Sequence, residues 1–260
     1  MNRRLGWILA SVLASTELEW AYDAAWPKDR PPQAPPALQQ IVELENTARL
    51  LAILLDSGRS VINENLPPPE SPGRTAIMPP DLFERQLTEM FLSRSGADLH
   101  DLDHAKLPAR GKRLLKELIA VSKEVVVEAQ PGISRAPLGE KELIPAVFGA
   151  RTAIRFSERT GVRLKQTALS PRNPANAPDA SERLALEAFA DSSYPREKVI
   201  SEVTAKSDSL RLMYPLYTTR HCLDCHGDPK GERDRLGYPR EGLKLGQNAG
   251  AISVMIPLKP

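Results

Sequence analysis

The only two cysteines of this chain, Cys222 and Cys225, lie three positions apart in the stretch "HCLDCHGDP" (221–229). A disulfide between them would close a very short loop and would remove little entropy from the unfolded chain. A structural disulfide is therefore a poor explanation for the pair. The placement of both thiols in one window, with His226 directly after the second, indicates a chemical role instead.

Three kinds of site share this spacing. Structural zinc usually takes four ligands, whereas Cys222, Cys225 and His226 offer three, and the chain has no second Cys-x-x-Cys pair. A thioredoxin-type redox pair belongs near a βαβ unit, which the surrounding sequence lacks. The remaining interpretation is C-x-x-C-H, in which both thiols attach haem and the histidine binds its iron. We therefore predict one covalent haem c, with a redox disulfide as the alternative.

The N-terminus has the pattern of a secretory signal peptide. Arg3 and Arg4 precede a short apolar stretch over 5–14, which ends in small residues suited to cleavage. We predict a signal peptide or N-terminal anchor over residues 1–15. Because covalent haem attachment takes place outside the cytoplasm, the prediction for the whole protein is the periplasm.

Composition excludes one class of partner and marks the loops. The chain has 35 basic and 33 acidic residues and no basic stripe with interleaved aromatic residues, so nothing supports nucleic-acid binding. Its 24 prolines cluster at 27–36, 67–72 and 171–178. The first cluster predicts an extended linker over residues 16–36, and the other two predict stiff loops between folded elements.

Hydrophobic periodicity predicts an α+β fold. Helices are expected at 37–65, 80–95, 110–130, 144–160 and 179–190, and strands at 162–169, 210–217 and 251–258. The last two strands are separated by the haem motif and loops, without a crossover helix, which predicts antiparallel pairing.

The sequence also contains a faint internal repeat. A shift of 65 residues overlays nine identical residues between positions 57–99 and 122–164, most clearly "FLSRSGADL" on "FSERTGVRL". This pattern predicts two copies of a helix–loop–helix–strand unit, of which only the second continues into the haem motif. Coincidence between two amphipathic helices that end in Ser/Thr-Gly is the alternative.

From Gly111 onward the chain resembles a family of single-haem periplasmic domains with a PAS-like fold, found as free cytochromes and as sensor modules of histidine kinases and chemoreceptors. The matching segments are "TGVRLKQTALSPRNPANAPDASERLALEAF" (160–189), "YPLYTTRHCLDCHGDP" (214–229) and "GLKLGQNAGAISVMIPL" (242–258). The resemblance implies a PAS-like antiparallel sheet with helices on one side and a haem at its edge. It covers 111–260, which leaves 37–110 as a preceding helical region.

The resemblance also implies roles for individual residues. Cys222 and Cys225 become the thioether anchors and His226 the proximal ligand. Some members supply a cysteine as the sixth ligand from a helix ahead of the "RNP" loop, but this chain has Ser122 at that position. The identity of the sixth ligand is therefore undecided. The other candidate ligands in the sequence are Met213, His100 and His104.

Other residues are candidates for the walls of the pocket. Arg172, in the "PRNPANAP" loop, carries a planar guanidinium that suits a haem propionate, although the loop is equally well explained as a stiff turn. Tyr214, Tyr217 and Tyr238 flank the motif, with core packing as the alternative. His221 directly precedes Cys222 and is expected to face solvent.

These observations predict a periplasmic monohaem c-type cytochrome that acts in electron transfer or in redox or gas sensing. Its expected partners are a redox protein or a membrane-bound signalling or electron-transfer complex, with a diatomic gas as a further ligand. The alternatives are a haem enzyme (a peroxidase or nitric oxide-handling protein) and a haem-bearing accessory subunit. The enzyme is less favoured because no distal His–Arg pair has a recognisable spacing. The chain shows no output module after its last strand, which favours a free cytochrome or a receptor domain that signals through a separate partner.

Overall fold

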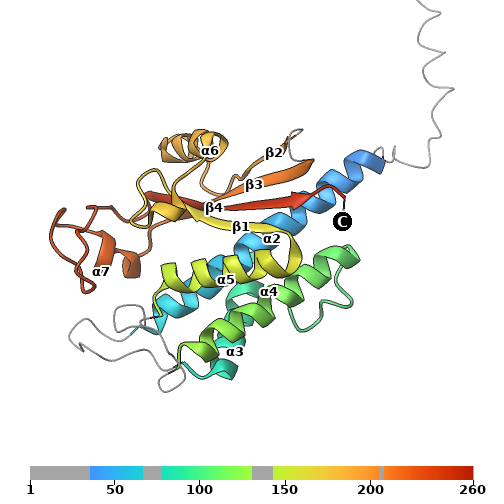
Figure 1. Ribbon diagram of the computed structural model, residues 1–260, viewed down its shortest axis with the longest axis horizontal. Coiled ribbons are helices and arrows are strands. Elements are labelled where there is room, and N and C mark those ends of the chain that lie inside the picture. The colour runs from blue at the N-terminus through green and yellow to red at the C-terminus, as the bar shows by residue number, and fades with distance from the viewer. Residues whose placement is uncertain (1–35, 67–77, 131–142, 205–207, 260) are drawn as a thin grey trace, which may run out of the picture. The chain divides into compact units, whose positions relative to one another are not determined.

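The computed structural model describes residues 36–66, 78–130, 143–204 and 208–259 (Figure 1). The predicted signal peptide, nearly all of the linker and the proline cluster at 67–72 lie outside these residues. Contacts divide the chain into Met1–Leu38 and Gln39–Pro260, and the sheet, its helices and the cysteine motif belong to the second unit. No helix within the described ranges is long and apolar enough to cross a membrane.

All five predicted helices are present, within two residues at each end. They are α2 (Pro36–Glu64), α3 (Pro80–Ser95), α4 (Ala109–Glu128), α5 (Pro145–Thr160) and α6 (Ala180–Ala190). Two 3-10 turns, η2 (Pro174–Asn176) and η3 (Arg220–Cys222), and the one-turn helix α7 (Leu223–His226) complete the helical elements of the described chain.

Local sequence explains where the helices begin and end. Pro80 and Pro145 stand in the first turns of α3 and α5, where a missing N–H costs nothing. Gly96 and Gly161 end these helices with φ of 71° and 70°, a left-handed conformation that glycine adopts without strain. At the start of α6, Asp179 and Glu182 cap each other's backbone N–H groups.

Four antiparallel strands form the sheet, in the order β1-β4-β3-β2. The strands are β1 (Arg163–Thr167), β2 (Ile200–Thr204), β3 (Ser209–Tyr217) and β4 (Asn248–Pro257). The α+β class and the antiparallel pairing are therefore confirmed. Strand β2 was not predicted: it is an edge strand whose three central residues are exposed, so it lacks a buried apolar face.

Helices cover both faces of the sheet, whereas the resemblance implied one face. Alternation along β3 sends Leu210 and Leu212 into the large core shared with α2–α5, and sends Met213 into a smaller cluster under α6 (Figure 1). The second layer exists because α6 has its own apolar side, with Leu186 and Phe189 buried against the sheet.

The two halves of the predicted repeat agree in their helices and differ after them. Helices α3 and α5 are offset by 65 residues at both ends, and the matching Phe83 and Phe148 contact each other with ring centroids 5.5 Å apart. After Gly161 the chain enters β1. After Gly96 it forms turns over 97–108, so the strand predicted for the first copy is absent from that stretch. Gene duplication itself stays a prediction.

Candidate functional site

The C-x-x-C-H motif comes directly after the end of the central strand β3, where η3 and α7 carry it at one end of the sheet (Figure 1). Thr218 fixes the start of this segment. Its buried hydroxyl donates to the carbonyl of Lys244 at 2.5 Å. Its backbone donates to Gln247 and accepts from Gly246, each at 2.9 Å. The motif is therefore tied to the loop that leads into β4.

Cys222 and Cys225 are both free thiols and both half-buried. A separation of three residues in helical conformation places them on one side of the turn. Burial raises the pKa of the Cys225 thiol, and the nearby Asp234 carboxylate raises it further. Reactive redox cysteines have the opposite property, a lowered pKa. The raised pKa of Cys225 therefore gives no support to a reactive redox role for this thiol.

His226 ends helix α7, and its ring is held through one nitrogen. Nδ1 lies 2.7 Å from Oε2 of Glu241, and since a carboxylate can only accept, Nδ1 carries the proton. In the neutral ring, Nε2 then carries the free lone pair, which can bind a metal ion. The turn is closed tightly behind it: a Cβ on Gly227 would lie 2.5 Å from the carbonyl oxygen of Leu223, so only glycine fits there.

Arg172 joins the "RNP" loop to the C-x-x-C-H motif through a dense set of hydrogen bonds. Its Nε and one terminal nitrogen bind the two oxygens of Glu241, at 2.5 and 2.9 Å. The other terminal nitrogen binds Oδ2 of Asp234 at 2.6 Å. The guanidinium also donates to the backbone carbonyl of Cys225 at 2.9 Å, and it lies 5.5 Å from the ring centroid of the exposed Tyr238. One arginine thus clamps three separate segments together.

The charges of this cluster are stabilised by one another. Burial raises the pKa of Asp234, but the hydrogen bonds from Arg172 and from two backbone N–H groups outweigh this and hold the pKa below its ordinary value. Burial acts in the same way on Glu241, and the hydrogen bonds from Arg172 and His226 again leave its pKa lowered. Both groups are therefore carboxylates at neutral pH. The donors of Arg172 are already engaged, so the geometry supports a clamp and gives no support to the predicted propionate contact.

An aromatic cluster lies beside the motif on the α6 side of the sheet. Arg196 lies 5.1 Å from the ring centroid of Tyr217, the last residue of β3, and the rings of Phe189 and Tyr194 meet edge to face. The hydroxyl of Tyr217 is buried, and the described residues give it no hydrogen-bond partner. A buried polar group without a partner costs about 1–3 kcal/mol. The Tyr217 hydroxyl is therefore able to donate a hydrogen bond to a bound group.

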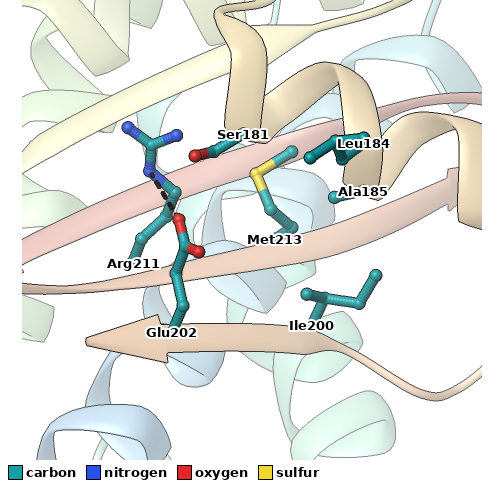
Figure 2. Close-up of a pocket in the computed structure, with 7 residues that line it drawn as sticks. All are labelled: Ser181, Leu184, Ala185, Ile200, Glu202, Arg211 and Met213. Carbon is teal, nitrogen blue, oxygen red and sulfur yellow. Dashed lines mark ion pairs between the residues drawn. The ribbon is translucent and has the colours of Figure 1, made fainter. Parts of the chain in front are cut away.

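The structure places Met213 and Tyr214 away from the motif, on opposite faces of β3. Met213 is 2% exposed and packs under α6, where it lines a cavity of about 190 Å³ together with Arg211 and Ile200 (Figure 2). Tyr214 faces the α2 side, where burial raises the pKa of its hydroxyl and Asp56 raises it further. Packing within the core accounts for both side chains.

His100 and His104 are exposed in the turns at 97–108, which directly precede α4. At the start of α4, Arg110 donates to the carbonyl of Pro257, at the end of β4 farthest from the motif. A ten-residue strand spans roughly 30 Å. The structure therefore does not bring either histidine to Cys222 and Cys225. The ring of His104 pairs with Asp101 instead.

Ser122 and His221 are the last two candidates, and neither contributes to the motif. Ser122 is buried in α4 among apolar residues of the large core. His221 is exposed, as expected. Within the described part of the chain, no group of three or more His, Cys, Asp or Glu residues is arranged to hold a metal ion.

The residues that sequence reasoning missed are Glu241 and Asp234. They lie 69 and 62 positions from Arg172, and no local spacing connects them to it. The only signal in the sequence was their place in a polar loop within sixteen residues of the motif. A charged side chain in such a loop can contact His226. The sequence of the loop does not indicate which of its charged residues makes the contact.

Comparison with known proteins identifies one family. A sequence model of the Tll0287-like family, described as Tll0287, matches residues 37–257. A search of curated proteins gives no match. Among solved structures, the chain matches the crystal structure of the cyanobacterial heme-protein Tll0287, with 21% sequence identity and a TM-score of 0.40 over 58% of this chain and 96% of that one.

Proposed function

The chain belongs to the Tll0287-like family, and from that premise we propose that it is a c-type haem protein with a single haem held by Cys222, Cys225 and His226. One observation carries the proposal. Two reduced thiols stand on one helical turn, and the histidine directly after them has Nδ1 fixed by a carboxylate and Nε2 free. This is the donor set that covalent attachment and axial ligation of haem require.

Each residue then has a defined task. Cys222 and Cys225 provide the thioether sulfurs, and His226 provides the axial nitrogen. The buried hydroxyl of Tyr217 offers a hydrogen bond that the described chain does not satisfy. When bound, the haem would supply one-electron redox chemistry and a position for a diatomic ligand. Arg172 keeps the motif and the loop before β4 in one arrangement throughout, because its donors bind both segments.

We further propose that the sixth position of the iron is open or weakly filled, which favours a sensor over a simple electron carrier. The support is the placement of the candidate ligands. Met213 is committed to the core under α6, and Ser122 is a poor iron ligand. Both histidines lie in the exposed turns that precede α4, whose start contacts the end of β4 farthest from the motif. An open position lets carbon monoxide or nitric oxide bind, whereas two strong protein ligands favour electron transfer.

The proposal extends to location and partners. Covalent attachment requires export, so the basic and apolar pattern of residues 1–15 is proposed to direct the chain to the periplasm. There a redox protein or a membrane-bound signalling complex would receive or supply the electron.

Intact mass spectrometry tests the attachment. The protein is expressed for export in cells with a cytochrome c maturation system, denatured and extracted with acid–acetone. The expected mass is that of the polypeptide plus one haem, and the double variant Cys222→Ser, Cys225→Ser should have the mass of the polypeptide alone. A wild-type mass without haem would refute the proposal.

Carbon monoxide tests the open position. The reduced holoprotein is mixed with the gas and the Soret band is followed. A fast and complete shift is expected. If the band does not shift and the spectrum is already low-spin, a strong sixth ligand is present, and Met213→Ala then shows whether the thioether supplies it.

A further inference from the structure

We infer that Glu241, held in place by Arg172, is a positioning residue that sets the reduction potential of the iron by keeping a negative charge against His226. The inference rests on the proposed function, because it concerns the ligand of a haem. Glu241 lies outside the C-x-x-C-H motif and would set a property of the iron that the motif alone does not determine.

The first support is the geometry of the contact. The 2.7 Å separation between Nδ1 of His226 and Oε2 of Glu241 is a short, charge-assisted hydrogen bond. Both oxygens of the same carboxylate bind Arg172, which fixes the plane of the group. A carboxylate that can neither rotate nor withdraw holds the imidazole in one tautomer and one orientation.

The second support is the charge balance. Arg172 is shared between Glu241 and Asp234, so this cluster of two carboxylates and one guanidinium carries one net negative charge beside the neutral imidazole. The side chain of Asp234 is fully buried and that of Glu241 is 31% exposed, which limits screening by water. Arg172 donates to both oxygens of Glu241, the paired contact that an arginine makes with an ionised carboxylate.

The consequence for the iron is electrostatic. Ferric iron carries one more positive charge than ferrous iron, so a nearby negative charge stabilises the ferric form and lowers the reduction potential. A carboxylate that accepts from Nδ1 also makes Nε2 a stronger donor, which acts in the same direction. Reduction adds one electron to the iron and moves no proton out of the His226–Glu241 pair. The electron must come from a one-electron donor, the role of a redox protein partner.

Potentiometric titration of the holoprotein tests the inference. The variant Glu241→Gln keeps the shape of the side chain and an oxygen that can accept from Nδ1, but removes the charge. At the wild-type midpoint potential, its ratio of ferrous to ferric protein should rise at least tenfold, which equals about 59 mV for a one-electron couple. The ferrous iron–histidine stretching band in resonance Raman spectra should move to lower frequency, as expected for a weaker donor.

The matched control is Glu232→Gln. Glu232 belongs to the same loop and carries the same charge, but its exposed side chain pairs only distantly with Arg240, at 3.7 Å, and has no contact with His226. This variant should change the ratio much less than tenfold. Glu241→Asp keeps the charge at a longer distance and should give an intermediate potential.

The outcomes separate the two proposals. Equal midpoint potentials for Glu241→Gln and Glu232→Gln, with an unchanged Raman band, would overturn the role of Glu241 while leaving covalent haem attachment intact. A wild-type protein that carries no covalent haem would refute the proposed function itself, before any potential is measured.

Discussion

The sheet with its helices and the segment that carries the motif are stabilised in different ways. Helices α2–α6 and the strands bury apolar side chains, with Phe83, Phe91, Phe148 and Phe156 completely enclosed. The segment 218–247, which we name the motif lobe, contributes no residue to the buried hydrophobic core. The non-glycine residues that it buries are polar, Thr218 and Asp234. It is held by hydrogen bonds and by the Arg172 clamp.

This difference bears on what the motif lobe is for. A segment of some thirty residues without an apolar core falls below the size at which chains usually fold by themselves, and such segments rely on a metal, a crosslink or a bound group. A flat apolar cofactor attached at Cys222 and Cys225 would supply the missing apolar surface. We therefore expect mutations in the hydrophobic core to lower the stability of the whole protein. Mutations of Arg172 should lower the stability of the motif lobe alone.

The largest effect is expected from Phe148→Ala. This side chain is completely buried, contacts Phe83 and lies so close to Gly58 that a Cβ there would be 2.7 Å from its ring. Loss of its packing should lower the free energy of unfolding by about 3–5 kcal/mol. Denaturant titration followed by circular dichroism measures the change. The control is Ile154→Ala on the same helix, where the side chain is 61% exposed and the change should stay within about 0.5 kcal/mol.

A smaller and local effect is expected from Arg172→Ala. The variant leaves Glu241 and the buried Asp234 without their cation, so the free energy of local opening of the motif lobe should fall by about 2–3 kcal/mol. Hydrogen exchange should show faster exchange over 218–247 and unchanged exchange in α2. Arg155→Ala removes ion pairs with Glu128 and Glu124 from the helix surface and should have an effect of at most about 1 kcal/mol. If both variants opened the protein equally, the distinction between the two regions would be wrong.

The smallest effect is a pH dependence confined to the motif lobe. The pKa values of Asp234 and Glu241 are lowered from ordinary values of 3.8 and 4.5. Groups with a lowered pKa stabilise the folded state above the ordinary value, and the stabilisation is lost as the pH falls through the folded value. Exchange rates over 218–247, corrected for intrinsic rates, should therefore be level between pH 7 and 5 and rise below about pH 4.5. Asp234→Asn should flatten this dependence, and a flat wild-type profile would contradict it.

The regular elements were predictable because their signals are local. The bounds of α3 are set by Pro80 and Gly96, and the alternation in β3 is visible in successive residues. Strand β2 was missed because an exposed edge strand has no apolar face, even though Val199, Ile200 and Val203 are β-branched.

The candidate site was predictable only in part, for a related reason. Cys222, Cys225 and His226 form a local motif, and the prediction of haem attachment rests on their spacing alone. The partner of His226 depends on the path of the loop before β4, and that path is fixed by long-range bonds such as Leu243 N–H to the His226 carbonyl. Arg172 was identified from its side-chain chemistry, but its partners were not, because they are brought together only by the fold.

Hydrogen exchange on two forms of the full chain tests most directly whether the motif lobe is organised around a covalent haem. The haem-loaded protein is compared with the haem-free double variant Cys222→Ser, Cys225→Ser under identical conditions. We predict that haem slows exchange strongly over 218–247 and leaves α2 and α4 nearly unchanged. Equal exchange of the motif lobe in the two forms would contradict the account, because that segment would then be complete without a cofactor.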